Sequence, residues 1–337
     1  MRLKMYAILV TAALAMTAQV AMAQGHWTIA RTLPVGGDGG WDYGALDTAS
    51  GHLFLTRFNR MDIVESSTGK IVASLPGLKA AHGVALVPKL HRGFLTDGGS
   101  GEVVAFDMTT GTKLGALKAI PDVDDIHYDT AMDRVFVASG DGNALLSFAP
   151  EIDLKTGAMD ESIALGGAPE ALTSDGKDTV YVNLADKNLV AVVSVRQKKV
   201  LARWPVAPGG RPVSIGLDVA HHRLYVGCRN PQQLVVFDTE SGKVVGSAPI
   251  GAGTDAAAFA NGHAFVSCGE GQLVIASFHD GQLVIDQTLA TQKGSRIVVA
   301  DESGRTLYLP AAEFEPATTG RPKVKPGSFT VLVVAEP

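Results

Sequence analysis

The stretch at residues 213–245, VSIGLDVAHHRLYVGCRNPQQLVVFDTESGKVV, decides the fold of this protein. It begins with an apolar run, turns at residues 220–222, and continues through the strand-like RLYVGC and the alternating QLVVFD. A polar turn at residues 239–243 then leads into another apolar run. This order predicts three short strands and the start of a fourth, joined by connections of hairpin length. One such sheet cannot bury both of its faces alone, so the unit is expected to recur.

The unit does recur along the chain when copies are aligned on the strand that ends LYVGC. The copies are spaced by about 40 to 45 residues, which is typical of four-stranded propeller blades and not of helical repeats. Each copy precedes a second strand-like segment, and in most blades a glycine-containing turn comes next. The aligned copies are HLFLT (52–56), RGFLT (92–96), RVFVAS (134–139), TVYVN (179–183), RLYVGC (223–228), HAFVSC (263–268) and TLYLP (306–310).

Seven copies predict an all-β fold, a seven-bladed β-propeller in one domain that spans residues 24–337. The chain ends soon after the third strand of the last blade, so that blade lacks an outer strand. The segment HWTIARTLP (26–34) has a strand pattern without a partner and is expected to complete it. Closure of this kind removes exposed sheet edges. Two insertions break the period, at 150–160 and 313–327, and the second is interpreted either as a lid or as a tolerated surface insertion.

The N-terminus predicts export. Arg2 and Lys4 precede an apolar run at residues 6–20, and Ala21 and Ala23 fit a signal-peptidase site, so residues 1–23 are expected to be a cleaved signal peptide. The alternative is an N-terminal membrane anchor, but no other apolar segment approaches spanning length. Removal of two cations from 29 leaves 27 Lys and Arg against 34 Asp and Glu, a net charge of −7. This balance argues against a broad nucleic-acid or anionic-membrane surface, and a monomer in the periplasm or outside the cell is expected.

Several segments carry a resemblance to a known family. They are DGGWDYGALD (38–47), HGVALVP (82–88), HHRLYVGC (221–228), YLPAAEFEP (308–316) and PGSFTVLVV (326–334). With these segments the chain resembles the YVTN-repeat (YncE-like) β-propellers of exported bacterial proteins. The resemblance implies a periplasmic or secreted seven-bladed propeller and no particular reaction. Relatives often place a cysteine where this chain reads APGGRP (207–212), so the resemblance implies no local disulfide here. Similar propellers include binders of single-stranded nucleic acid, but this chain has no aromatic-basic stripe.

The least ordinary feature is a ring of ionisable residues. The first strand of each blade lines the channel of a propeller, and fold-level analogy places sites at its mouth. A fixed distance before each aligned copy lies a charged or ionisable residue. These predicted rim residues are Asp42, His82, Asp124 with Asp125, Glu170, Arg211, Asp255 and Arg296.

Three interpretations of the ring stay open. The rim charges could simply pair with one another around a water-filled channel. Alternatively, His82, Arg211 and Arg296 hold a carboxylate or phosphate, and the acids set its register. In the third, Asp42, Asp125, Glu170 and Asp255 hold a divalent cation for a lactonase-like hydrolase. Because no GxSxG, HExxH, CxxC or Walker motif is present, we favour a binding module for a small molecule or protein, with a metal-dependent hydrolase as the alternative.

Trp41 and the two cysteines complete the candidate residues. Trp41 follows a glycine-rich entry segment and is predicted to lie at the channel mouth, where it would stack on a ligand or plug the mouth. Cys228 and Cys268 occupy equivalent places in consecutive blades. We interpret them as free thiols, because a disulfide requires closer Cα atoms. The alternatives are a disulfide or a soft-metal site with a rim residue such as His82.

Overall fold

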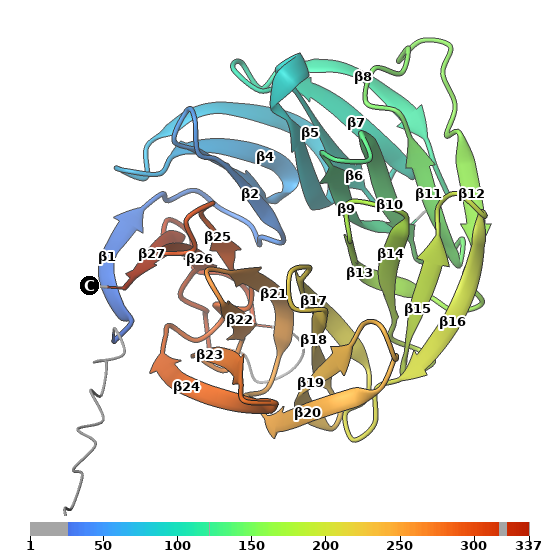
Figure 1. Cartoon of the computed structure of the whole chain (residues 1–337). Coiled ribbons are helices and arrows are strands. Elements are labelled where there is room, and N and C mark those ends of the chain that lie inside the picture. The colour runs from blue at the N-terminus through green and yellow to red at the C-terminus, as the bar shows by residue number, and fades with distance from the viewer. Residues whose placement is uncertain (1–25, 121, 317–321, 337) are drawn as a thin grey trace, which may run out of the picture.

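The protein forms a ring of antiparallel sheets around a central channel (Figure 1). A computed structural model describes residues 26–120, 122–316 and 322–336. The predicted signal peptide at residues 1–23 therefore lies outside the described residues. Apart from one short 3₁₀ helix, η1 (Pro88–Leu90), the regular elements of the described residues are all strands. The all-β propeller prediction is therefore confirmed.

Five of the sheets contain four strands each, and in four of these the strands follow one another along the chain. One sheet consists of β9 (Val123–Asp129), β10 (Arg134–Ser139), β11 (Ala144–Phe148) and β12 (Glu161–Ala164). The next consists of β13 (Pro169–Ser174), β14 (Thr179–Leu184), β15 (Leu189–Ser194) and β16 (Lys199–Pro205). It is followed by β17 (Pro212–Asp218), β18 (Arg223–Arg229), β19 (Gln232–Asp238) and β20 (Val244–Pro249). Next come β21 (Thr254–Ala260), β22 (His263–Cys268), β23 (Gln272–His279) and β24 (Gln282–Ala290).

The sheet nearest the start of the chain has seven strands, because two groups of strands share β5. Its members are β2 (Gly44–Asp47), β3 (His52–Thr56), β4 (Phe58–Glu65), β5 (Ile71–Val87), β6 (Arg92–Asp97), β7 (Glu102–Asp107) and β8 (Lys113–Lys118). The first part of β5 pairs with β4, and its last part pairs with β6. Division of β5 into these two parts would give seven groups of four strands, but the blade number itself stays a prediction.

The ring closes with strands from both ends of the chain. β1 (Thr28–Pro34) pairs antiparallel with β27 (Thr330–Ala335). β27 pairs in turn with β26 (Thr306–Ala311), and β26 pairs with β25 (Val299–Ala300). The register runs from Thr28 opposite Ala335 to Pro34 opposite Thr330. The prediction that an N-terminal strand completes the last sheet is confirmed.

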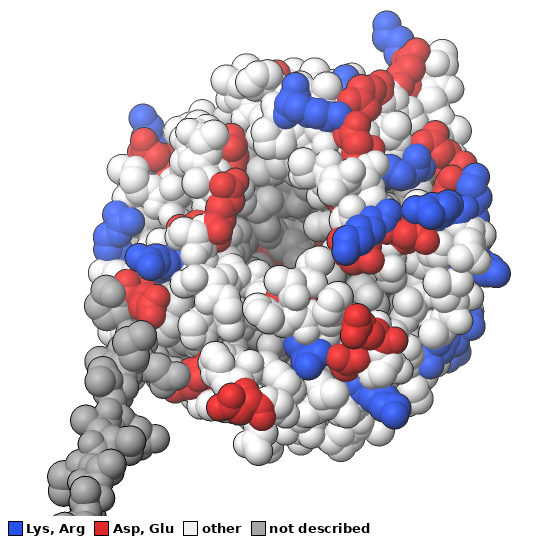
Figure 2. Space-filling model, viewed as in Figure 1, with Lys and Arg blue, Asp and Glu red and all other residues white. Residues whose placement is uncertain are grey.

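The aligned copies form the second strand of each four-stranded group and are its most buried part. The central residues of β10, β14, β18 and β22 are fully buried, because each strand has a neighbour on both sides and a further sheet against each face. An outer strand such as β16 instead alternates between exposed and partly buried residues, as expected for a strand with one solvated face. Acidic and basic side chains are interspersed around the central hollow on the face shown in Figure 2.

Candidate functional site

Six of the seven predicted rim positions meet in one cavity of about 440 Å³ at the mouth of the channel. Asp42 precedes β2, His82 lies within β5, Glu170 and Asp255 lie near the starts of β13 and β21, and Arg296 precedes β25. Asp124, named in the sequence beside Asp125, also lines this rim pocket. The full lining is Asp42, Tyr43, His82, Asp124, Glu170, Arg229, Gly253, Asp255 and Arg296. Residues far apart in sequence are thus brought to one place by the ring.

One wall of the rim pocket is basic. Asp255 pairs with two guanidinium groups, through Oδ1 with Arg229 and through Oδ2 with Nε of Arg296 at 2.6 Å. Arg229 also donates from Nε to the carbonyl of Thr254 at 2.8 Å, and Arg296 donates to the carbonyl of Trp41 at 2.6 Å. Among the described residues, Nη1 of each guanidinium has no hydrogen-bond acceptor. This wall therefore keeps donors that face a ligand.

A second wall is formed by His82 between two carboxylates. Its Nδ1 lies 2.7 Å from Asp42 Oδ2 and 3.9 Å from Asp124 Oδ1. Burial alone would lower the pKa of His82, but the hydrogen bond to Asp42 and the nearby charge of Asp124 raise it to about 9. The two carboxylates therefore stabilise the protonated form of His82.

The carboxylates of Asp124 and Glu170 form the rest of the acidic wall. Burial, and then the charge of Asp42, raises the pKa of Asp124 well above its usual value. Burial also raises the pKa of Glu170, against the opposing effect of Arg229. Among the described residues Glu170 has no salt-bridge or hydrogen-bond partner. Both carboxylates therefore offer acceptor atoms to the rim pocket.

Asp125 points to a different cavity. Its carboxylate accepts hydrogen bonds from the backbone N–H groups of Ile126 and Leu172 at 2.8 and 2.9 Å. It lines a deeper channel cavity of about 280 Å³ that also contains His127. Burial raises the pKa of Asp125 to about 7, although the two backbone hydrogen bonds lower it. Asp125 is thus a rim residue by chain position, while its side chain belongs to the channel below the rim pocket.

The basic residue from the β17–β18 pair is Arg229, and the prediction of Arg211 is corrected. Arg211 is exposed and does not line the rim pocket, and its backbone adopts a positive φ of 52° just before β17. Its carbonyl accepts a hydrogen bond from the N–H of Arg229 at 3.0 Å. Arg229 therefore lies directly beside the predicted position and turns its own side chain inward. The sequence signal that was missed is the residue immediately after the RLYVGC copy.

The carbonyl of Trp41 accepts a hydrogen bond from Arg296, and the Trp41 ring lies in the core. The indole is 4% exposed and packs against Phe314 and Phe329, with ring centroids 6.0 and 5.5 Å apart. The Arg296 guanidinium lies 5.4 Å from the Trp41 ring. A buried ring offers no free face to a ligand, so the stacking role predicted for Trp41 does not match its position.

Cys228 and Cys268 are free, fully buried thiols. They belong to different core clusters, and burial raises the pKa of each to about 12. Because both thiols are free, they do not form a disulfide with each other. A thiol with so high a pKa is also a poor source of the thiolate that a soft metal requires. The interpretation as free thiols agrees with the structure.

The predicted metal ligands also need correction. Asp125, Glu170, Asp255, Cys228 and Cys268 do not form a group with metal-ligand spacing. Among the described residues, one group of three does: Asp42, His82 and Asp124, whose candidate ligand atoms all lie within 4.8 Å of one another. The sequence identified all three as rim residues, but nothing in the repeat spacing showed which of them would be adjacent.

Polar side chains at the ends of the second strands fix the rim residues. Thr56 Oγ1 donates to the carbonyl of His82 at 2.6 Å, and Thr96 Oγ1 donates to the carbonyl of Asp124. Thr96 Oγ1 also accepts from the N–H of Gly83 at 2.8 Å. Equivalent contacts join Asn183 to Ser214 and Ser267 to Ser295. The fifth residue of several aligned copies thus ties one blade to the first strand of the next.

We expect Thr96→Val to lower the free energy of unfolding by about 2 kcal/mol. The isosteric change leaves the buried N–H of Gly83 and the carbonyl of Asp124 without their partner. Urea denaturation followed by circular dichroism measures the effect. Thr109→Val, in an exposed turn, is the control and should change stability by less than about 0.5 kcal/mol. Equal effects of the two changes would contradict the assigned role of Thr96.

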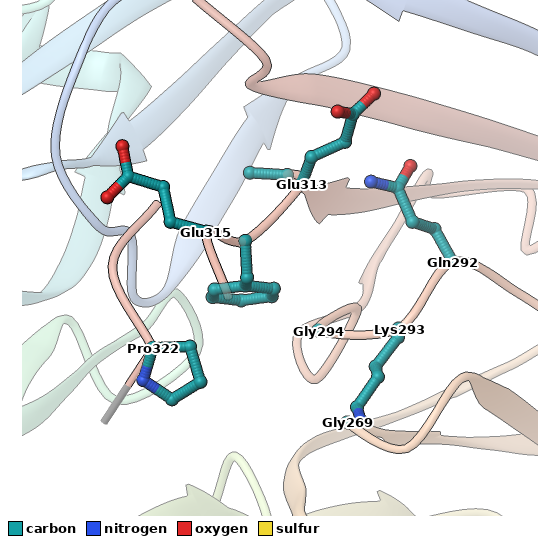
Figure 3. A pocket seen from close by; sticks show the side chains of 9 residues that line it. Gly269, Gln292, Lys293, Gly294, Glu313, Glu315 and Pro322 are labelled. Carbon is teal, nitrogen blue, oxygen red and sulfur yellow. The ribbon is translucent and has the colours of Figure 1, made fainter. Parts of the chain in front are cut away.

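A larger cavity of about 670 Å³ lies beside the rim pocket (Figure 3). The segment with Glu313 and Glu315 bounds it on one side, and the loop from Gln292 to Gly294 bounds it on the other. Phe314 and Val324 form an isolated antiparallel β-bridge. A Cβ on Gly294 would lie 2.6 Å from the ring of Phe314, so that ring rests directly on the loop that leads to Arg296. Whether the 313–327 insertion acts as a lid stays a prediction.

Comparisons with known proteins support the fold alone. No protein-family model matches the chain, and no curated protein matches it. A chain of Kuenenia stuttgartiensis hydrazine synthase is similar in structure, with a TM-score of 0.67 and 14% identity, over 82% of this chain and 92% of that one. A chain of the mitotic checkpoint complex has a TM-score of 0.73 and 13% identity, over 92% and 96%. None of the described residues forms a helix long and apolar enough to cross a membrane.

Proposed function

We propose that this protein is an exported binding module whose rim pocket takes a small polar ligand. The observation that carries the proposal is the opposed pair of walls in one cavity, with free guanidinium donors on Arg229 and Arg296 and free carboxylate acceptors on Asp124 and Glu170. Propeller folds commonly present such sites at the channel mouth. The proposed periplasmic or extracellular location rests on the predicted signal peptide at residues 1–23.

The charges of the pocket favour a ligand that both donates and accepts hydrogen bonds. Asp255 pairs with each guanidinium, and Nη1 of each guanidinium has no hydrogen-bond acceptor among the described residues. Across the pocket, Glu170 lacks an ion-pair partner among the described residues. Because unpaired buried charges are costly, a polar ligand that meets both walls gains more than an apolar one. This arrangement extends the carboxylate or phosphate interpretation, with Arg229 in the place of Arg211.

The hydrolase alternative has weaker support than binding. A lactonase-like reaction needs a metal-activated water beside the substrate carbonyl. Among the described residues, Asp125, Glu170 and Asp255, which were predicted to hold that metal, form no group with metal-ligand spacing. Binding requires only the charged walls that are present, so it is the function proposed.

Thermal-shift and calorimetric screening of the mature protein tests the proposal. The panel holds small cations, anions, zwitterions and neutral polyols. For a ligand that binds, Arg229→Met and Glu170→Gln should each weaken binding by at least about 10-fold, because each removes a charged hydrogen-bonding group. Arg196→Met is the control, since Arg196 is exposed and lies outside the pocket. If every panel member fails to bind, or if a binder responds equally to all three changes, the small-ligand proposal is wrong. A panel member that is consumed would instead favour the hydrolase.

A further inference from the structure

We infer that Asp42, His82 and Asp124 bind one divalent first-row transition-metal cation on the acidic wall of the rim pocket. The inference deepens the proposed function and rests on it, because the ion would form part of the same ligand site. The proposed ligands are Nδ1 of His82 and one carboxylate oxygen each from Asp42 and Asp124. This set differs from the metal ligands expected from the sequence.

The positions of the three ligand atoms suit a metal centre. Nδ1 of His82 lies 2.7 Å from Asp42 Oδ2 and 3.9 Å from Asp124 Oδ1. With metal–ligand bonds of about 2.1 Å, neighbouring ligands of a tetrahedral or octahedral ion are about 3.0 to 3.4 Å apart. The two observed separations lie on either side of this range. Small rotations of the carboxylates would therefore bring all three atoms to coordination distance without a change in the backbone.

The imidazole is held with Nδ1 toward the carboxylates. A Cβ on Gly98 would lie 3.0 Å from both Cδ2 and Nε2 of His82, so the glycine makes room for that edge of the ring. Thr56 fixes the carbonyl of His82, and Thr96 fixes the carbonyl of Asp124. The two backbone positions are thus set by neighbouring blades, and a preformed ligand set costs little ordering when an ion binds.

The charge of the rim pocket is balanced by a divalent ion. The lining includes four carboxylates, from Asp42, Asp124, Glu170 and Asp255, and two guanidinium groups, from Arg229 and Arg296. A divalent cation coordinated by neutral His82 would bring the net charge of this set to zero. The Asp124 carboxylate, which is 24% exposed, accepts no side-chain hydrogen bond from the described residues and forms an ion pair with Nδ1 of His82 at 3.9 Å. Its carboxylate has the free lone pairs that a ligand requires.

The donor set selects the type of ion. Imidazole nitrogen with carboxylate oxygen suits Zn²⁺, Mn²⁺ or Fe²⁺, whereas Ca²⁺ and Mg²⁺ prefer oxygen alone. Three protein ligands leave at least one position for water or a ligand atom. That position would face the cavity between the acidic wall and the guanidinium groups of Arg229 and Arg296. A polar ligand with an oxygen anion could then contact the ion and a guanidinium together.

Metal binding by the mature protein tests the inference with the ion alone. Chelator-treated protein is titrated with Zn²⁺ and with Mn²⁺ by calorimetry, and the bound metal is counted by mass spectrometry after desalting. One ion per chain is expected for at least one of the two metals. His82→Gln and Asp124→Asn should each weaken binding by more than about 100-fold, because loss of a direct ligand exceeds the effect of losing an outer partner. Co²⁺ should give a visible absorption spectrum that His82→Gln abolishes.

His221→Gln is the matched control. His221 also pairs through Nδ1 with an aspartate, Asp218, at 2.8 Å, but it is exposed and has no second carboxylate in a metal-spaced group among the described residues. It should bind metal like the unchanged protein. Binding below one ion per chain for both metals, or equal loss in His221→Gln and in His82→Gln where circular dichroism shows folded protein, would overturn the inference. Because no organic ligand is used, a failed ligand screen leaves this result unaffected. A protein that binds a panel ligand but neither metal would overturn the metal inference and leave the proposed function intact.

Discussion

A chain that begins at residue 35 is expected not to fold into a stable ring. This truncation removes β1 and leaves β27 as an open sheet edge, because β1 pairs with β27 along its whole length. It also removes the buried side chains of Trp27 and Leu33, which are 2% and 4% exposed. Loss of one buried tryptophan alone costs about 3 to 5 kcal/mol, which is a large share of the roughly 5 to 15 kcal/mol that stabilises a domain.

Trp27 also connects the sheet that contains β1 to the sheet that contains β22 and β24, so its loss would destabilise both sheets. Its N–H donates to Gln287 Oε1 at 2.9 Å, and Gln287 Nε2 donates back to its carbonyl at 2.8 Å. The Trp27 ring meets the Phe265 ring edge to face, with centroids 5.0 Å apart. Yield of soluble protein and the midpoint of thermal unfolding measure the outcome. A chain that begins at His26 is the control, and a truncated chain with the same midpoint as this control would refute the closing role of β1.

The sequence was sufficient to predict the strands, because every repeat has an apolar second strand that must be buried on both faces. The copies RVFVAS and HAFVSC coincide with β10 and β22 residue by residue. Their apolar runs are bounded by turn residues, and each must be buried on both faces. The sequence did not show that β5 would run without interruption from one group of strands into the next. Repeat alignment places each strand but does not reveal whether the connection between two strands stays extended.

The sequence predicted which backbone positions lie at the rim, but it did not predict where their side chains point. A fixed distance from each aligned copy located Asp42, His82, Glu170 and Asp255 correctly at one cavity. The same distance selected Arg211, which is exposed and does not line the rim pocket. Alignment by chain position gives the place of a Cα atom, whereas side-chain direction depends on the local turn and on the alternation of the strand. Contacts between side chains of adjacent sheets, such as that of His82 with Asp124, are tertiary and have no signature in the local sequence.

Arg57→Met is expected to lower the free energy of unfolding by about 3 kcal/mol. Arg57 is fully buried, lies over the Phe329 ring at 3.5 Å, and pairs with Asp62 at 3.4 Å. Its guanidinium also donates to the carbonyls of Gly40 and Asp38 at 3.2 and 3.1 Å. Methionine fills a similar volume but cannot donate to the carbonyl of Gly40, and it removes one partner of the buried Asp62 carboxylate, which is costly in a charged network.

The loss should reach the rim, because Arg57 fixes the segment that leads into Asp42. Arg60→Met is the matched control. Its guanidinium contacts the same Asp62, at 3.0 Å, but its side chain is 20% exposed, so we expect a loss of about 1 kcal/mol. Urea denaturation gives both values, and calorimetry with Zn²⁺ or Mn²⁺ reports on the rim. If Arg57 holds the entry segment in place, Arg57→Met weakens metal binding in protein that is still folded, whereas Arg60→Met does so less. Equal stability losses in the two variants would show that burial of the Arg57 guanidinium contributes nothing beyond its pairing with Asp62.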